Sequence, residues 1–184
     1  MRIIAGAWRG RTIDAPAGTA TRPTSDRARE GLFSMLASRI GSFEDLQIAD
    51  LFAGTGALGL EALSRGAAHC TFVEKDRAAL DALRRNVDRL GAGERADIRA
   101  QAVEHAPPPA RPYDIVFIDP PYGTGLALAG LERAADWLAP GGWISLESHG
   151  EKLAPPAGLA VVAERRFGKA LISLFHLASA RSSG

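Results

Sequence analysis

Apolar positions follow two different patterns along this chain. From residue 28 to residue 40 they recur at the spacing of one helical face, which predicts a helix that residues 24–25 (Thr-Ser) can cap. Gly41 ends this helix. Upstream, short apolar runs at residues 3–4 and 12–13 flank a Trp-Arg-Gly-Arg segment and predict a small hairpin or an irregular arm.

Beyond residue 45, short buried runs alternate with helical periodicity. The apolar runs predict strands at residues 48–52, 70–74, 96–100, 113–119, 143–147, 159–166 and 170–177. Helical spacing predicts helices at residues 60–64, 77–90 and 126–138. Asp76 caps the second helix, and Pro140-Gly141-Gly142 predicts a turn. This alternation is typical of an α/β fold with a parallel, doubly wound sheet, and the last two strands predict an antiparallel hairpin.

The length and composition are those of a globular protein. The 184 residues are 46% hydrophobic and 23% charged, which excludes a disordered chain. We expect an N-terminal arm and helix at residues 1–45, an α/β domain at residues 46–178 and a flexible tail at residues 179–184. No apolar run has the length of a membrane span, and no signal-peptide core is present, so a cytoplasmic location without membrane contact is expected.

The charge distribution is more informative than the net charge of +1. The first 40 residues hold arginines at positions 2, 9, 11, 22, 27, 29 and 39 against three acidic residues. The arginine guanidinium suits bidentate phosphate contacts, which favours a nucleic-acid partner. A solvated basic surface explains the same pattern, and for the arginines taken alone it is the preferred interpretation.

A glycine-rich segment follows the first predicted strand. Gly54, Gly56 and Gly59 match G-x-G-x-x-G between a strand and a helix, and Glu74 ends the next strand about 20 residues later. Glycines let the backbone approach a ligand, and the helix N-terminus offers free N–H groups to an anion. The pattern serves NAD as well as S-adenosylmethionine, and a tight turn without any ligand is the third interpretation.

The sequence Asp119-Pro120-Pro121-Tyr122 follows the fourth predicted strand and borders the same crevice as Gly54. The prolines remove N–H donors, which leaves the Asp119 carboxylate and the Pro120 carbonyl as paired acceptors for an NH2 group. These hydrogen bonds can aim the lone pair of a base amino nitrogen at a methyl donor, and the Asp119 charge stabilises the growing positive charge. Tyr122 offers a ring for stacking an unstacked base. The alternative is a strand-terminating turn with a packed tyrosine.

The cysteine and histidine content argues against two other kinds of chemistry. Cys70, the only cysteine, begins a predicted strand and so lies at the wrong end of a parallel sheet for a nucleophile. We expect it to be a small buried apolar side chain, which disfavours methylation of carbon through a cysteine. A single cysteine also excludes an intrachain disulfide and fits a reducing compartment. The histidines and the cysteine show no metal-ligand spacing.

Four segments resemble one known family. They are residues 2–11 (RIIAGAWRGR), residues 22–30 (RPTSDRARE) with the following Leu-Phe, residues 52–67 (FAGTGALGLEALSRGA) and the Asp-Pro-Pro-Tyr turn. Together they resemble the bacterial 16S ribosomal RNA guanine-N2 methyltransferase family (RsmD-like) over nearly the whole length. The Asp-Pro-Pro-Tyr turn is also found in adenine-N6 methyltransferases. The two N-terminal segments narrow the resemblance to the guanine-N2 family.

The resemblance implies a class I, Rossmann-like methyltransferase with a seven-stranded, mostly parallel sheet, an antiparallel C-terminal hairpin and a short basic N-terminal arm. It implies S-adenosylmethionine-dependent methylation of a guanine N2 in 16S ribosomal RNA within the small ribosomal subunit. The enzyme is expected to be a monomer without a metal. The family has Asn where this chain has Ser34. Gly31 is a poor helix residue that is expected to loosen its helix, and Gly168 matches a family glycine near the last hairpin.

The resemblance also assigns site residues. Those expected to bind the cofactor are Asp50, Phe52, Ala53, Gly54, Thr55, Gly56, Glu74, Lys75, Gln101, Ala102 and Asp119. Those expected to hold the target base and act in catalysis are Asp119, Pro120, Pro121 and Tyr122. Those expected to contact RNA phosphates are Arg9, Arg11, Arg22, Arg27 and Arg29. Arg22 is the first choice, although each arginine can equally be a surface charge. Arg165, Arg166 and Lys169 form a second basic cluster with either role.

Two further functions stay open at this point. An NAD-dependent oxidoreductase would use the glycine motif, yet it has no role for residues 119–122 and should be stabilised by NAD rather than by S-adenosylmethionine. A ribosome-assembly module that binds RNA without catalysis would have no reason to keep Asp119 and Tyr122 together.

Overall fold

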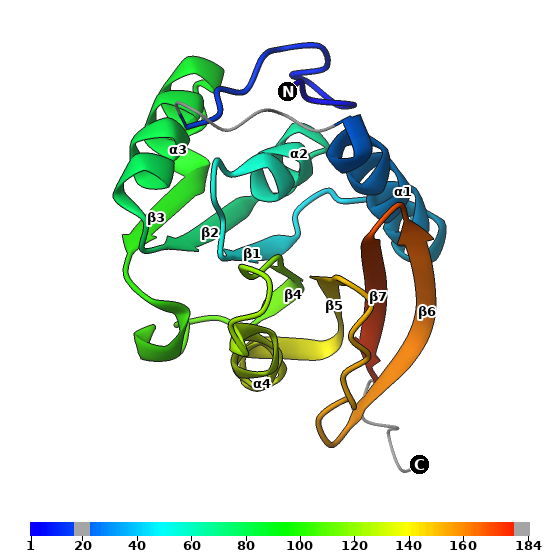
Figure 1. The fold of residues 1–184 in the computed structure, drawn as a ribbon. Helices are drawn as coiled ribbons and strands as arrows, with labels where there is room; N and C mark the ends of the chain where they lie inside the picture. The colour runs from blue at the N-terminus through cyan, green and yellow to red at the C-terminus, as the bar shows by residue number, and fades with distance from the viewer. Residues whose placement is uncertain (17–22, 179–184) are drawn as a thin grey trace.

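One mixed sheet organises the molecule in the computed structural model, which describes residues 1–16 and 23–178 (Figure 1). Within these ranges the strand order is β3-β2-β1-β4-β5-β7-β6. The strands are β1 (Gln47–Leu51), β2 (His69–Glu74), β3 (Ala96–Ala100), β4 (Tyr113–Ile118), β5 (Leu138–Ser148), β6 (Leu159–Phe167) and β7 (Ala170–Leu177). The helices are α1 (Pro23–Ile40), α2 (Ala57–Ser64), α3 (Arg77–Leu90) and α4 (Leu126–Trp137), with 3₁₀ turns η1 (Gly93–Arg95) and η2 (Val103–His105). The predicted tail at residues 179–184 lies outside the described residues.

One strand of the described sheet, β7, runs in the opposite direction to all the others. The pairs β3-β2, β2-β1, β1-β4 and β4-β5 are parallel, whereas β7 is antiparallel to both β5 and β6. The predicted parallel sheet and C-terminal hairpin are therefore confirmed. Strand order reverses between β1 and β4, where Leu51 is in register with Ile118. In open α/β sheets, a crevice for ligands forms at the carboxyl ends of the strands at such a point.

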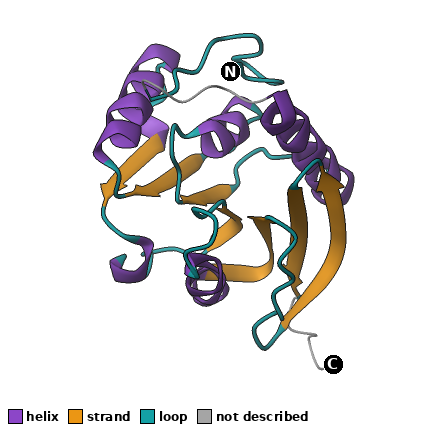
Figure 2. Cartoon of the chain, viewed as in Figure 1, coloured by secondary structure: helices purple, strands orange, loops and turns teal. Residues whose placement is uncertain are grey.

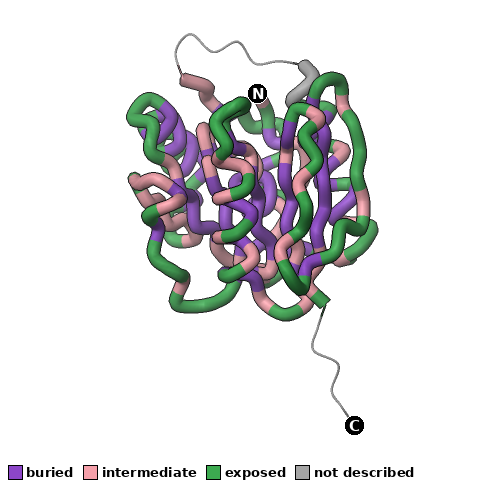
Figure 3. The backbone as a smooth tube through the Cα atoms, turned by 60° about the horizontal axis from the view of Figure 1, so that its bottom comes forward, coloured by how far each residue is buried: buried purple, intermediate pink, exposed green. Residues whose placement is uncertain are grey.

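Helices cover both faces of the sheet, as Figure 2 shows. Helices α1, α2 and α3 lie on one face and α4 lies on the other. Successive strand residues alternate between the two cores: Ile48 packs with residues of α1 and α2, while Ala49 packs with residues of α4. Buried backbone therefore runs through the middle of the molecule, as Figure 3 shows. Among the helices of the described ranges, none combines the length and apolarity that crossing a bilayer requires.

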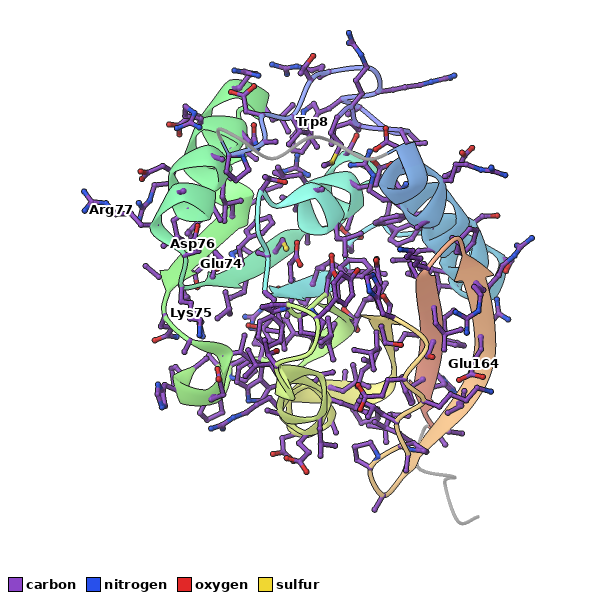
Figure 4. The ribbon with its side chains drawn as sticks, in the orientation of Figure 1. Trp8, Glu74, Lys75, Asp76, Arg77 and Glu164 are labelled. Carbon is purple, nitrogen blue, oxygen red and sulfur yellow. The ribbon has the colours of Figure 1, made fainter. Side chains whose placement is uncertain are left out.

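The N-terminal arm is packed into the first of these cores. Arg2 and Thr12 form a single antiparallel bridge, which confirms the predicted irregular arm. Ile3, Trp8 and Ile13 are buried in the same core as the residues of α1 and α2, and Figure 4 shows Trp8 near the end of the molecule that the arm covers. The first 45 residues therefore share one hydrophobic core with the α/β part of the chain.

Two polar side chains of α2 hold the arm in place. The fully buried Glu61 carboxylate accepts hydrogen bonds from the N–H groups of Ile4 (2.8 Å) and Ala5 (3.0 Å). The Ser64 hydroxyl donates to the Ala5 carbonyl (2.6 Å) and accepts from the Trp8 N–H (3.0 Å). The arm is therefore a fixed part of the fold, because its backbone polar groups are satisfied by buried partners.

The arm is also connected to the glycine loop through Asn86 of α3. This fully buried amide accepts from the Asp14 N–H (2.8 Å) and donates to the Asp14 and Thr55 carbonyl oxygens (3.0 Å each). Asp14 also forms a two-pronged ion pair with Arg89, with both N–O distances 2.7 Å. The arm, α3 and the glycine loop therefore meet at the Asn86 side chain. The hydrophobic periodicity of the sequence had placed this residue in a helix and indicated nothing more about it.

Tertiary structure overturns one local prediction and explains one unexpected glycine. The expected turn at residues 140–142 is a bulge inside β5, because the register with β4 jumps from Leu138 to Trp143 and Gly141 has φ +79°. Gly31 lies within the continuous helix α1, and a Cβ there would lie 2.1 Å from the Phe167 ring at the turn of the last hairpin. A glycine is needed at this position because helix and hairpin approach so closely.

Helix starts agree with the capping signals at α3. The Asp76 side chain accepts a hydrogen bond from the Ala79 N–H (2.9 Å), as the sequence predicted. Helix α1 begins at Pro23, one or two residues before the predicted cap. A proline at the first helical position loses no hydrogen bond, because that N–H has no partner within the helix.

Candidate active site

The glycine loop after β1 and the Asp-Pro-Pro-Tyr turn after β4 lie side by side at the carboxyl edge of the sheet, because the two strands pair. Two cavities open there, of about 440 Å³ and about 270 Å³. Phe52 and Asp119 line both cavities and so stand between them. The larger cavity is also lined by Asp50, Ala53, Gly54, Thr55, Tyr122 and Glu147. The smaller is also lined by Glu74, Lys75, Gln101, Ala102, Pro120 and Pro121.

The glycines of the loop have different tasks. Gly54 has φ +57°, and a Cβ there would meet nothing within 4 Å, so this part of the loop faces open space. Gly56 lines neither cavity, and a Cβ there would lie 2.4 Å from the Leu83 side chain. A Cβ at Gly59 would lie 2.3 Å from Phe72 and 2.6 Å from the Cys70 sulfur. Gly56 and Gly59 therefore allow close packing of helix and strand, as in the dinucleotide motif.

Glu74, at the end of β2, organises the loop with its carboxylate. One oxygen accepts from the Gly54 N–H (2.8 Å), and the other accepts from the N–H groups of Lys75 and Asp76 (2.8 Å each). Figure 4 shows these side chains together beside α3. A carboxylate has about four acceptor positions, so Glu74 can still accept from a ligand in the smaller cavity, which it lines.

Asp50 is buried beneath the loop. Its carboxylate accepts a hydrogen bond from the Gly59 N–H (2.9 Å). Burial raises the pKa of Asp50 to about 8, a rise that the hydrogen bond from Gly59 opposes and the negative charge of Glu74 supports. Among the residues that the structure describes, no cationic side chain pairs with Asp50, and a buried carboxylate of this kind that faces a cavity is suited to a positively charged ligand group.

In the turn after β4, Asp119 and Tyr122 line the larger cavity, and Asp119, Pro120 and Pro121 line the smaller one. Burial, followed by the charges of Glu147 and Asp50, raises the pKa of Asp119 well above its usual range. Pro120 is buried, whereas the Tyr122 side chain is 45% exposed. The Tyr122 hydroxyl donates to the Glu147 carboxylate (2.8 Å). Its ring stacks on His149, with ring centroids 3.3 Å apart.

The sequence indicated nothing about His149, and it placed Glu147 only as the end of a strand. Glu147 lies at the carboxyl end of β5, the same edge of the sheet as Asp119, so its position in a parallel sheet was the signal that could have found it. His149 belongs to an irregular segment without a periodic pattern. Both residues border the mouth of the site.

Comparison with known proteins places the chain in a family. The family model described as "Conserved hypothetical protein 95" matches residues 1–176. The chain belongs to this family. Ribosomal RNA small subunit methyltransferase D of Escherichia coli K12 is 44% identical over 148 residues, which cover 80% of this chain and 71% of that protein. Its counterpart in Haemophilus influenzae is 37% identical over 175 residues, or 91% of this chain and 89% of the relative.

Solved structures agree with this family assignment. A putative methyltransferase of Escherichia coli superimposes with a TM-score of 0.85 at 39% identity, covering 97% of this chain and 98% of that chain. A putative methylase of Haemophilus influenzae gives a TM-score of 0.79 at 32% identity, with coverage of 97% and 98%. The fold is the class I methyltransferase fold, and this member of the family is a methyltransferase.

Cys70 takes no part in the site of this family member. It is fully buried at the start of β2, against the glycine that packs α2 on the sheet. Burial raises the pKa of its thiol well above the usual range, so the reactive thiolate is disfavoured. The expectation of a small buried apolar side chain is confirmed.

The arginines expected to contact RNA do not lie in equivalent places in this family member. Arg9, Arg11 and Arg27 are exposed, and Arg11 donates to the Arg89 carbonyl. Arg22 lies outside the described residues. Arg29 is only 5% exposed and lines the larger cavity, so it is not available as a surface contact for a phosphate. The second basic cluster, Arg165, Arg166 and Lys169, is exposed around the turn of the last hairpin.

Proposed function

We propose that this chain transfers a methyl group from S-adenosylmethionine to the exocyclic N2 of a guanine in 16S ribosomal RNA of the small ribosomal subunit. The observation that carries the proposal is the position of Asp119-Pro120-Pro121-Tyr122 on the wall that separates two cavities, beside the glycine loop. The relatives named as ribosomal RNA small subunit methyltransferase D support the RNA substrate. We expect the protein to act as a monomer in the cytoplasm, without a metal.

The residues at the carboxyl edge fit the cofactor. The loop at Gly54 leaves open space where a Cβ would otherwise project, and Asp50 is a buried acceptor without a cationic partner. We assign the methionine half to Asp50 and the loop at residues 52–55, and the ribose to Glu74. Lys75, Gln101 and Ala102 of the smaller cavity would border the adenine. When bound, the cofactor supplies an electrophilic methyl group on a positively charged sulfur.

Asp119 and Pro120 would act on the substrate amine. Their oxygen atoms accept its two protons, so the nitrogen lone pair is held towards the methyl donor. The carboxylate then stabilises the positive charge that grows on nitrogen. The raised pKa of Asp119 describes the site without its ligands, and a cation bound nearby favours the ionised form that this task requires. The methylated amine is acidic and loses its proton without a strong base.

Tyr122 would receive the base at the mouth of the site. Its ring is exposed, and one face already stacks on His149. An unstacked guanine can pack on aromatic surface of this kind after it has left its neighbours in the RNA. The exposed Arg9, Arg11 and Arg27, with Arg22, would contact phosphates at a distance from the base.

The test uses small ribosomal subunits from cells that lack this enzyme. They are incubated with labelled S-adenosylmethionine and the purified protein, and the digested RNA is examined by mass spectrometry. N2-methylguanosine is expected. Label on adenine N6 would keep the mechanism and reject the base assignment, and absence of label despite cofactor binding would reject methyl transfer to this RNA.

The Asp119→Ala variant is the matched control for that experiment. It should bind cofactor and lose most of its turnover, by on the order of a hundredfold or more, because an oriented acceptor and a stabilising charge are both removed. Near-normal turnover of this variant would reject the lone-pair argument while leaving the reaction itself intact.

A further inference from the structure

Arg29 of α1 is a buried cation with unused hydrogen-bonding capacity. Its side chain is 4% exposed. One terminal nitrogen, Nη2, donates to the Arg2 carbonyl of the arm and lies 3.4 Å from the Asp26 carboxylate. Nε and the other terminal nitrogen, Nη1, are buried and have no hydrogen-bond partner within the described residues. A buried guanidinium with two unpaired donors is unfavourable, so an acceptor from outside the chain is expected to complete it.

The surroundings of Arg29 limit what that acceptor can be. Arg29 lines the larger cavity together with Asp50, Asp119 and Glu147, and it is the only basic side chain among the described lining residues. Ala57 and Leu58, in the first turn of α2, line the same cavity; the Gly59 N–H of this turn donates to Asp50, and the N-cap residue Gly56 has no side chain to cap the others. A helix N-terminus adds partial positive charge beside the guanidinium. The cavity therefore combines one positive region with several carboxylates.

We propose that Arg29 binds the carboxylate of the cofactor's α-amino acid group. This inference rests on the proposed function, in which S-adenosylmethionine occupies the cavity. An α-amino acid group carries a carboxylate and an ammonium on one carbon, which matches a cavity lined by both Arg29 and Asp50. Nε and Nη1, which have no partner among the described residues, are the donors that remain for such a carboxylate, and hydrogen bonds from a guanidinium to a carboxylate are among the strong ones.

An RNA phosphate fits the same place less well. It would bring negative charge without a compensating cation into a cavity lined by Asp50, Asp119 and Glu147. It would also have to reach a side chain that is almost fully buried and fixed to the arm through Arg2. Arg29 was expected to contact RNA, and we now assign it to positioning the cofactor. Its hydrogen bond to the Arg2 carbonyl connects the arm to the cofactor site.

Two ligands that differ in the amino acid group test this assignment without measuring turnover. S-adenosylhomocysteine carries the group, and 5′-methylthioadenosine lacks it. Binding of each is measured by calorimetry for the wild type, Arg29→Met and Arg29→Lys, with Arg39→Met, at an exposed arginine of the same helix, as the matched control. Circular dichroism and melting temperature establish that each variant is folded.

Arg29→Met is expected to weaken S-adenosylhomocysteine on the order of thirtyfold or more, as truncating a buried charged hydrogen bond does, and to change 5′-methylthioadenosine by less than about threefold. Arg29→Lys should be intermediate, since it keeps the charge and loses the planar guanidinium with its several fixed donors. If Arg29→Met does not fold, Arg29→Lys carries the comparison. Arg39→Met should leave both affinities unchanged.

The remaining outcomes separate this inference from the proposed function. Equal weakening of both ligands by Arg29→Met would assign Arg29 a merely structural role, and no weakening of either would leave its nitrogens without a ligand. Both results overturn the inference and leave the cofactor in place. A wild-type protein that binds neither ligand would overturn the proposed cofactor, and this inference with it.

Discussion

Glu61 allows the docking of the arm to be tested quantitatively. Its buried carboxylate accepts from the Ile4 and Ala5 N–H groups and from Arg65 Nε (2.9 Å). Glu61→Ala leaves two backbone donors and a guanidinium unpaired, and losing one partner of a buried ion pair costs about 3–5 kcal/mol. For a chain of this size each kcal/mol lowers the melting temperature by about 2–4 °C, so a decrease of about 6–20 °C is expected. Glu61→Gln keeps one acceptor and should cost less.

The assay combines thermal unfolding with amide hydrogen exchange. Glu132→Gln, an exposed glutamate on α4, is the matched control and should melt within about 2 °C of the wild type, as surface substitutions usually do. In Glu61→Ala, the amide hydrogens of Ile4 and Ala5 should exchange faster than the amide hydrogens of the central strands. The reasoning is refuted if Glu61→Ala melts with the control and these two amides keep their protection, because the arm would then be held by apolar contacts alone.

Three other perturbations test separate parts of the structure. Gly59→Ala should destabilise the fold by about 1–3 kcal/mol, because the new Cβ would overlap Phe72 and Cys70. Denaturant unfolding measures this loss of stability. An unchanged denaturation midpoint would mean that α2 can shift away from the sheet. For Asp50, a folded-state pKa of about 8 means that the folded state holds a proton that the unfolded chain has released above about pH 4. The free energy of unfolding of the unliganded wild type, measured relative to that of Asp50→Asn, should therefore fall as pH rises from about 4 to about 8 and then level off. The total decrease should be no more than about 6 kcal/mol. If the difference between the two proteins in melting experiments does not change with pH, the raised pKa of Asp50 is contradicted. Arg9→Gln and Arg11→Gln should each reduce the slope of log binding constant against log salt concentration for RNA by about one unit. Point substitutions are preferred to deleting the arm, because deletion would also remove Ile3, Trp8 and Ile13 from the core. Unchanged slopes would show that these arginines do not contact phosphates.

Much of the fold followed from local signals. The strands β3 and β7 have the predicted bounds, and the other strands differ mainly at their ends. The exception is β5, whose predicted turn is a bulge. Periodicity identifies an element because each residue reports which face is buried. Whether a glycine-containing stretch forms a turn or a bulge depends on which of its residues pair with the neighbouring strand. Periodicity along one strand carries no information about this pairing.

The site divides in the same way. The glycine loop, Glu74 and Asp119 could be placed together from the sequence because they end parallel strands, and the ends of parallel strands share one edge. The partnership of Tyr122 with Glu147 and His149 required the spatial order of β4 and β5 and the path of the chain beyond β5. Sequence spacing gave no sign of these contacts, because 25 or more residues separate the partners.

By itself the sequence determined the order of elements, the glycine loop after β1 and the acceptor turn after β4. Each depends on residues close together in the chain, where steric and hydrogen-bonding preferences act directly. Tertiary structure alone decided that Gly31 must be a glycine, that Glu61 fixes the arm and that Arg29 faces the cavity instead of solvent. These properties depend on which distant segments α1 and α2 pack against, and burial, which packing creates, determines whether an arginine is a surface charge or part of a binding site.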